Sequence, residues 1–178
     1  MAKNVLIISS SPRKGGNSDT LCNRFMEGAK AAGHQVEKIF LKDKHIGYCT
    51  GCGTCNLGKP CPQKDDAAEI LDKMVGADVI VLATPVYFYT LSAQLKTLID
   101  RTCPRYTEIS NKDFYFIATM AETDRSMIDR TFDSIRGFLD CLENPHEKGV
   151  IVATGVWQKG EIEGNPALDE AYRAGKNC

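Results

Sequence analysis

A polar loop at residues 9–18 has the residue types that could bind an anion. It follows the apolar run at residues 5–8 and precedes a helical pattern that starts at Asp19. A helix start presents unpaired backbone N–H groups and the positive end of the helix dipole, so hydroxyls and a guanidinium there can bind phosphate. The alternative is an ordinary turn, in which Ser18 caps the helix and Arg13 faces water.

The form of this loop favours a mononucleotide. It contains neither Gly-x-Gly-x-x-Gly, which is typical of dinucleotide sites, nor the Gly-x4-Gly-Lys-Ser/Thr pattern of nucleoside triphosphate sites. Its polar groups are mainly Ser and Asn side chains with one Arg, and these suit a single terminal phosphate of modest charge. The loop therefore predicts a ligand such as FMN, bound through Ser9, Ser11, Pro12, Arg13, Asn17 and Ser18.

A second candidate site is the cysteine-rich segment at about residues 44–64. Its spacing is Cys-x2-Cys-x2-Cys-x5-Cys with a proline after the last cysteine, which favours a [4Fe-4S] cluster. Structural zinc more often uses two separated Cys-x2-Cys pairs, and a metal-free loop of thiols or disulfides is a third alternative. The four candidate ligands are Cys49, Cys52, Cys55 and Cys61, whereas Cys22, Cys103 and Cys141 are expected to be buried structural thiols.

Five apolar runs alternate with five helical patterns along the chain. We expect strands at residues 5–8, 35–41, 78–83, 114–120 and 149–154, and helices at 19–33, 66–74, 91–101, 126–142 and 166–176. Asp66 and Glu69 form a capping-box pattern at the second helix. The alternation predicts an α/β fold, a three-layer sandwich around a five-stranded parallel sheet of order 2-1-3-4-5, with residues 1–178 as a single domain.

In this topology ligands bind at the carboxyl ends of the first and third strands. The loop at residues 84–89 should therefore flank the phosphate loop. Tyr87 and Phe88 could present an aromatic face to a planar ring, or they could merely cover the end of the sheet. The remaining candidates around such a ring are Thr84, Pro85 and Val86, with Thr119 and Ala121 on its far side. Because the cysteine loop follows the neighbouring second strand, we also expect it beside the phosphate loop.

Composition limits the classes of partner. The chain has 178 residues with 22 basic and 23 acidic side chains, so its charge of −1 predicts neither a nucleic-acid nor an anionic-membrane partner. No apolar run reaches membrane length, and we expect a soluble, cytoplasmic protein. Eight cysteines without an export signal indicate metal or redox chemistry before a disulfide framework.

Together these motifs resemble the NADPH-dependent FMN reductase family of the flavodoxin-like superfamily, and most of all its iron-sulfur flavoproteins. The resemblance rests on the loop at residues 9–18, the cysteine loop followed by Asp65 and Asp66, the segment at residues 84–88, and Lys96 with Asp100 and Arg101. It implies FMN bound by the serine-rich loop and by the segment at Tyr87. It also implies a [4Fe-4S] cluster on the four loop cysteines, and a homo-oligomer in which a second subunit completes the flavin environment.

The expected function is an FMN-dependent oxidoreductase, in which FMN rather than a catalytic side chain carries the chemistry. Electrons would pass from NAD(P)H or a reduced carrier to a quinone, a flavin or an iron-sulfur acceptor, either a small molecule or a protein. One alternative is a flavodoxin-like or iron-sulfur flavoprotein electron carrier without its own NAD(P)H turnover. Another is a zinc- or thiol-based redox-sensing module centred on the cysteine loop.

Overall fold

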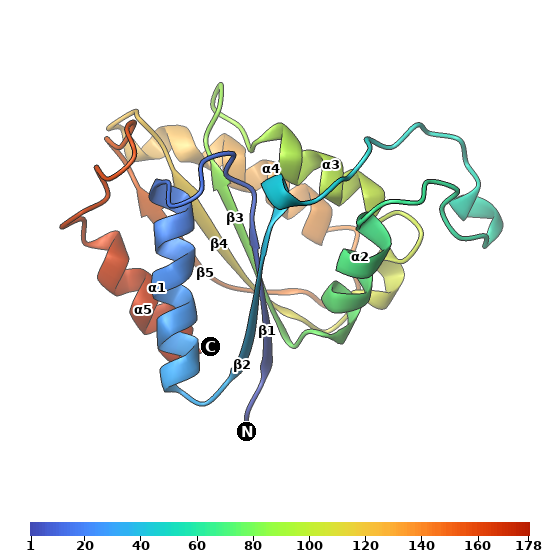
Figure 1. The fold of residues 1–178 in the computed structure, drawn as a ribbon, viewed down its shortest axis with the longest axis horizontal. Coiled ribbons are helices and arrows are strands. Elements are labelled where there is room, and N and C mark those ends of the chain that lie inside the picture. The colour runs from blue at the N-terminus through green and yellow to red at the C-terminus, as the bar shows by residue number, and fades with distance from the viewer.

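The computed structural model describes residues 1–178 and has a five-stranded sheet at its centre (Figure 1). The strand order is β2-β1-β3-β4-β5, and every neighbouring pair is parallel. The predicted α/β fold class and strand order are confirmed. The bounds are β1 Asn4–Ser9, β2 Gln35–Phe40, β3 Val79–Pro85, β4 Asp113–Thr119 and β5 His146–Ala153.

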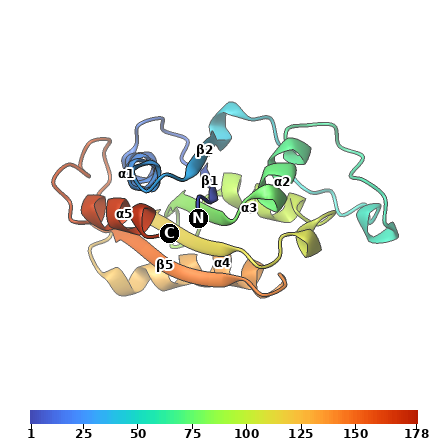
Figure 2. The ribbon, with the colours of Figure 1, turned by 90° about the horizontal axis from the view of Figure 1, so that it is seen from below.

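Helices cover both faces of this sheet (Figures 1 and 2). One face carries α1 (Asn17–Ala31) and α5 (Ala167–Lys176), and the other carries α2 (Ala67–Gly76), α3 (Ala93–Arg101) and α4 (Asp129–Leu139). Side chains alternate between the faces, so Val5 and Ile7 pack toward α1 while Leu6 and Ile8 pack toward α2 and α3. This double burial explains why the central strands are apolar throughout rather than alternating with polar residues.

Two glycines bring α1 and α5 into backbone contact. A Cβ atom at Gly28 would lie 2.0 Å from the carbonyl oxygen of Tyr172, and one at Gly175 would lie 2.0 Å from that of Phe25. No side chain fits at either position. The C-terminal helix is therefore packed directly against the helix that follows the loop at residues 9–18.

Two helix starts differ from the prediction. The helix expected from Asp19 begins at Asn17, and its N-cap Gly16 has no side-chain cap, so Ser18 is not the capping residue. The prediction of a capping box formed by Asp66 and Glu69 is wrong. Asp66 already has helical backbone angles, and its carboxylate accepts from the His45 N–H at 2.6 Å, while Asp65 accepts from the Ala67 N–H at 3.1 Å.

The helix expected at residues 126–142 is divided. A 3-10 turn at Arg125–Ile128 precedes α4, and the Asp124 side chain accepts from the Ser126 N–H at 3.0 Å. Because this turn has three residues per turn rather than 3.6, Met127 is rotated outward and is 39% exposed instead of facing the core. None of the helices is both long enough and apolar enough to cross a membrane.

The segment between β2 and α2 extends away from the sandwich, where Figure 1 colours it cyan to green. It contains only two short 3-10 turns, at Leu41–Asp43 and Cys55–Leu57. The second ends at Gly58, whose φ of +71° is the left-handed conformation that glycine adopts without strain. The rest of this cysteine-rich segment has no helix or strand.

Candidate functional site

A buried carboxylate organises the loop after β1. Asp19 accepts hydrogen bonds from the Ser9 hydroxyl at 3.1 Å and the Gly15 N–H at 2.9 Å, and it pairs with Lys38 at 2.8 Å. Burial by itself would raise the pKa of Asp19, but the Lys38 ammonium and the two donors outweigh it and lower that pKa below its usual value. Asp19 therefore stays ionised and joins both ends of the loop to α1.

The N-terminus of α1 is open to an acceptor from outside the protein. The backbone N–H groups of Asn17, Ser18 and Asp19 have no hydrogen-bond acceptor within the chain, and no side chain caps the helix. The loop approaches the helix start closely, because a Cβ at Gly16 would lie 2.9 Å from the Arg13 carbonyl oxygen. This arrangement suits an anion.

The segment after β5 closes over this loop. The Arg13 guanidinium donates to the Trp157 carbonyl at 2.9 Å, and the Lys159 ammonium donates to the Lys14 carbonyl at 3.1 Å. Glu161 accepts from the Trp157 N–H at 2.6 Å and from the neighbouring Gln158 N–H at 2.8 Å, which orders the segment. The phosphate loop and the chain about 145 residues later thus form one unit.

These segments surround a hollow of about 60 Å³ at the carboxyl edge of the sheet. Its lining brings together nine of the residues predicted for the site: Ser11, Arg13, Asn17, Ser18, Pro85, Val86, Tyr87, Thr119 and Ala121. Pockets that enclose a drug-sized ligand measure about 300–1,000 Å³. The hollow therefore has room for the phosphate end of a ligand, and a planar ring would lie outside it.

Four of the predicted residues do not line the hollow. Ser9 continues the side of β1 that faces α1 and bonds to Asp19, and Thr84 continues the opposite side of β3, where it accepts from the Ser92 N–H at 2.9 Å. Pro12 lies within the loop but outside the lining, and Phe88 is 99% exposed. Successive side chains of a strand point to opposite faces of the sheet, which explains why Ser9 and Thr84 point away from the hollow.

The exposure of Phe88 follows from a tight turn. Tyr87 and Thr90 exchange two backbone hydrogen bonds of 3.0 and 3.1 Å, and the residues between them, Phe88 and Tyr89, have φ of +49° and +60°. A left-handed conformation costs a non-glycine residue about 1–2 kcal/mol. The turn directs Phe88 into solvent and leaves Tyr87 at the hollow, 37% exposed.

Five residues of the lining were not predicted for the site: Gly16 and Met120 lie next to predicted residues, whereas Val156, Trp157 and Lys159 come from a segment that the sequence analysis did not assign to the site. They follow β5, whose carboxyl end lies at the same edge of the sheet as those of β1 and β3. Because ligands of this topology bind at the carboxyl ends of the strands, the segment after β5 could have been considered for the site. No sequence motif marks that segment. Its contacts reach across β4 and β3 to the loop after β1 and leave no local pattern in the sequence.

The base of the cysteine loop is held by a buried ion pair. Arg101 is 3% exposed and donates to both carboxylate oxygens of Asp65, at 2.6 and 3.0 Å, and to the Gly47 carbonyl at 2.7 Å. The Arg101 guanidinium lowers the pKa of Asp65 to about 2, and Asp65 in turn raises the pKa of Arg101. By contrast, Lys96 and Asp100 form an exposed pair on α3 at 2.6 Å.

Five thiols line one cavity of about 110 Å³ beside that ion pair: Cys49, Cys52, Cys55, Cys61 and Cys103. The Arg101 guanidinium lies 3.6 Å from the Cys61 sulfur, and the sulfurs of Cys55 and Cys103 lie 3.4 Å apart. All eight cysteines are free thiols. Thr54 hydrogen-bonds the Cys52 thiol and lowers its pKa.

Two sequence expectations for the cysteines are wrong. Cys103 and Cys141 are exposed, because they lie in the turns after α3 and α4 rather than within those helices, whereas Cys22 is buried as predicted. The cysteine loop also does not lie beside the phosphate loop. It begins next to β1, but Arg101 holds it at the end of α3, and the two cavities have no lining residue in common.

The four predicted ligands fit an iron-sulfur cluster in the kind of donor they offer. Thiolate is the usual ligand of such clusters, and all four thiols border the same space. No three His, Cys, Asp or Glu side chains of the chain are grouped so that they could hold one metal ion. A cubane makes a different demand, because each thiolate binds a different iron.

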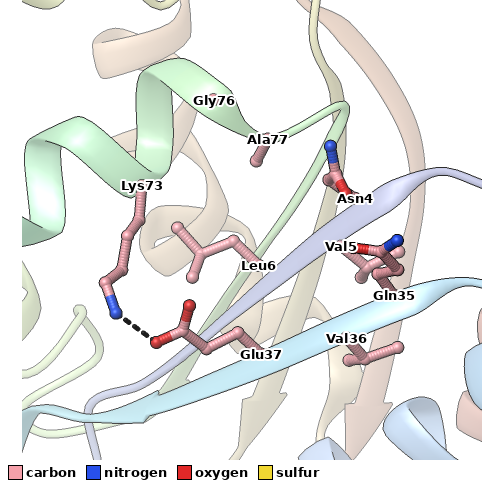
Figure 3. A pocket seen from close by; sticks show the side chains of 9 residues that line it. All are labelled: Asn4, Val5, Leu6, Gln35, Val36, Glu37, Lys73, Gly76 and Ala77. Atoms are coloured by element: carbon pink, nitrogen blue, oxygen red, sulfur yellow. Dashed lines mark hydrogen bonds and ion pairs between the residues drawn. The ribbon is translucent and has the colours of Figure 1, made fainter.

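A further hollow, of about 360 Å³, lies at the opposite edge of the sheet (Figure 3). It is bordered by the starts of β1 and β2 and the end of α2, and its one charged feature is the ion pair of Lys73 and Glu37. These two charges satisfy each other at the amino ends of the strands. Ligands of this topology bind at the carboxyl ends instead, so the hollow is not the candidate site.

Comparison with known proteins agrees with this geometry. A family model described as NADPH-dependent FMN reductase matches residues 3–143. An iron-sulfur flavoprotein of Methanosarcina thermophila is 31% identical over 166 residues, covering 92% of this chain and 83% of that protein. The chain belongs to the NADPH-dependent FMN reductase family, which confirms the resemblance predicted from the sequence.

Other relatives match over a shorter range. An iron-sulfur flavoprotein of Archaeoglobus fulgidus is 41% identical over 97 residues, which cover 54% of this chain and 44% of that protein. An iron-sulfur flavoprotein of Methanocaldococcus jannaschii is 45% identical over 100 residues, which cover 56% of this chain and 52% of that protein. The chain thus spans about half the length of these two relatives.

Solved structures show the same fold at low sequence identity. An NAD(P)H:quinone oxidoreductase from Methanothermobacter marburgensis has a TM-score of 0.81 at 18% identity, covering 99% of this chain and 96% of that one. An FMN-dependent NADH-azoreductase from Bacillus anthracis in complex with FMN has a TM-score of 0.74 at 17% identity, with 98% of both chains covered. These likenesses establish the flavodoxin-like fold.

Proposed function

We propose that the protein is an FMN-dependent oxidoreductase that takes electrons from NAD(P)H or a reduced carrier and passes them to a quinone, a flavin or an iron-sulfur acceptor. The observation that carries the proposal is the open N-terminus of α1 at the hollow. Three backbone N–H groups without acceptors and the Arg13 guanidinium meet there. Together they supply the donors that a terminal phosphate requires.

The hollow also has groups suited to the rest of FMN. The side-chain oxygen of Asn17 is buried without a hydrogen-bond partner, and as an acceptor it suits a ligand hydroxyl, such as one on a ribityl chain, rather than a phosphate. Tyr87 and Trp157 are 37% and 61% exposed and border the same hollow, where they offer apolar surface to a flat ring. Bound FMN would supply one- and two-electron transfer.

A ring against these residues would remain open to water on its other side. The hollow is too small to enclose it, and Phe88 beside it is almost fully exposed. We therefore propose that a second copy of the chain covers the ring, with the exposed turn at residues 87–90 in the contact. Light scattering in the presence of FMN tests this, since a monomer at micromolar concentration would contradict it.

Two measurements test the proposed function. Fluorescence titration should show FMN bound at one site per chain, and a protein that stays colourless after incubation with FMN would refute the proposal. Anaerobic stopped-flow mixing with NADH or NADPH then separates an enzyme from a carrier. Direct bleaching of the flavin absorbance supports the reductase, whereas reduction only through a partner protein supports the flavodoxin-like carrier.

For the cysteine loop we propose a [4Fe-4S] cluster on Cys49, Cys52, Cys55 and Cys61. Support comes from the spacing of these residues, from the cavity they share, and from the relatives named iron-sulfur flavoprotein. Anaerobic purification followed by iron and labile-sulfide analysis should give about four of each per chain. Zinc alone, or no metal, would favour the zinc- or thiol-based redox module instead.

A further inference from the structure

We propose that Cys55 and Cys103 are a redox-active thiol pair, which closes into a reversible disulfide and thereby controls whether the cysteine loop can take up metal. The disulfide itself rests only on the geometry of the two thiols. Its effect on metal uptake rests in addition on the cluster proposed above. Cys103 belongs to no part of the predicted ligand pattern, because it lies 48 residues away from Cys55 in the sequence.

The two thiols meet across the cavity of the cysteine loop. Their sulfur atoms lie 3.4 Å apart, and the Asn56 side-chain oxygen lies 3.9 Å from each. A disulfide bond is about 2.05 Å long, so closure requires a movement of little more than about 1 Å. Rotation of the two cysteine side chains could supply most of it.

Both partners lie on hydrogen-bonded backbone rather than on free ends. Cys55 opens the 3-10 turn that is closed by the Gly58 N–H at 3.0 Å, and the turn around Cys103 is closed by the Arg105 N–H to the Thr102 carbonyl at 2.8 Å. Two residues before Cys103, the buried Arg101 bonds to the base of the same loop. The contacts of Arg101 at the base of the loop therefore hold these two thiols close together. No other pair of cysteine sulfurs makes such a contact.

The pair is also accessible to a small oxidant. Cys103 is exposed, and Cys55 is half-buried in the lining of the same cavity. We name a low-molecular-weight disulfide as the oxidant. Attack by one protein thiolate on that disulfide gives a mixed disulfide and releases one small thiol. The second protein thiolate then attacks the mixed disulfide and releases the other, so two protein thiols are oxidised while one small disulfide is reduced to two thiols.

Closing this bond has a direct consequence for the loop. A cysteine in a disulfide has no thiolate to offer, so the set Cys49, Cys52, Cys55 and Cys61 would lose its third ligand. Conversely, Cys55 bound to iron cannot react with Cys103. Oxidation and metal uptake are therefore mutually exclusive, and Cys103 determines which one occurs when the loop is without metal.

Peptide mapping of the full-length protein tests the disulfide. Metal-free reduced protein is treated with oxidised glutathione, alkylated and digested with trypsin, which leaves residues 45–64 and 102–105 as separate peptides because Lys59 precedes a proline. We expect these two peptides to be linked in the wild type and in the control Cys141→Ser, whose thiol is exposed and contacts the Gly137 carbonyl rather than another sulfur. The link should be lost in both Cys55→Ser and Cys103→Ser.

Two results would contradict a disulfide between Cys55 and Cys103. A link that survives in Cys55→Ser would show that another loop cysteine is the partner, and wild-type protein carrying only glutathione adducts on Cys103 would show that the pair does not close. Either result overturns the proposal. Both are read by mass and do not depend on flavin or on activity.

Iron uptake tests the effect on the loop. After the same oxidation, wild-type protein should bind at least about tenfold less iron and sulfide than reduced protein, and dithiothreitol should restore the uptake. Cys103→Ser, which cannot close the pair, should load equally before and after oxidation. Equal loss of uptake in this variant would overturn the control of loading. If reduced protein takes up no iron at all, the proposed cluster and the control of loading both fail, while the peptide map still decides the disulfide.

Discussion

Replacing Asp65 by asparagine should destabilise the protein strongly although the residue lies at the foot of an exposed loop. Asp65 and Arg101 have side chains only 6% and 3% exposed, and they share two hydrogen bonds. The Asp65→Asn variant leaves the guanidinium buried without its counter-charge. Breaking a buried pair in this way costs about 3–5 kcal/mol of the free energy of unfolding.

The lowered pKa of Asp65 leads to an effect of the same order. A fall from the ordinary 3.8 to about 2 corresponds to about 2 kcal/mol of stability. Since the folded-state pKa is depressed, this stability is present at pH values above 3.8 and is lost as the pH falls toward 2. The difference between wild type and Asp65→Asn should therefore narrow by about 1 kcal/mol between pH 7 and pH 3.

The assay is urea unfolding of FMN-free protein followed by circular dichroism at both pH values. Asp100→Asn is the matched control, because it removes an aspartate from an exposed ion pair on α3, the helix that also carries Arg101. It should lower the free energy of unfolding by less than about 1 kcal/mol. A loss below about 1 kcal/mol in Asp65→Asn at pH 7, or a difference that does not change between pH 7 and pH 3, would refute the reasoning.

Three further predictions concern the hollow and the helices beside it. Arg13→Ala should weaken FMN binding about tenfold or more, measured by fluorescence titration, because it removes a charge-assisted donor worth about 1.5–3 kcal/mol, whereas Lys14→Ala in the same loop lies outside the lining and should bind normally. Lys159→Ala should weaken FMN binding in the same titration by severalfold, and unchanged affinity would exclude the segment after β5 from the site. Gly28→Ala should lower the free energy of unfolding, measured by urea denaturation, by about 1–3 kcal/mol, because α5 leaves no room for a methyl group. Gly137→Ala, with open space at its Cβ, should leave the stability unchanged or raise it.

The sheet could be predicted because local patterns determine it. Runs such as residues 78–83 are apolar on both faces, and this pattern requires helices on each side of a parallel sheet. The position of the polar loop at residues 9–18 between a strand and a helix was predictable for the same reason, since the three are contiguous in the sequence. Two of the residues predicted for the site, Ser9 and Thr84, point away from the hollow, and predicting this needed the phase of each strand as well as its position.

Contacts between distant segments were not predictable. Nothing local distinguishes Trp157 or Lys159 from other exposed loop residues, because their partners lie about 145 positions earlier. Arg101 was grouped by sequence with Lys96 and Asp100 at the end of one helix, yet it is buried against Asp65. Cys103 was expected to be buried, but it lies in the turn after α3, where its thiol is exposed although the end of the helix at Arg101 was predicted correctly.

The closure of the phosphate loop by the segment after β5 also determines when the site can form. During synthesis the loop at residues 9–18 leaves the ribosome early, whereas the carbonyl of Trp157 and the ammonium of Lys159 follow only when most of the chain has been made. The docking of α5 on α1 through Gly28 and Gly175 comes later still. At about 5–20 residues per second, the nascent chain exposes an incomplete anion site for several seconds or longer. A chain truncated before residue 157 would lack both contacts and leave the loop at residues 9–18 uncovered.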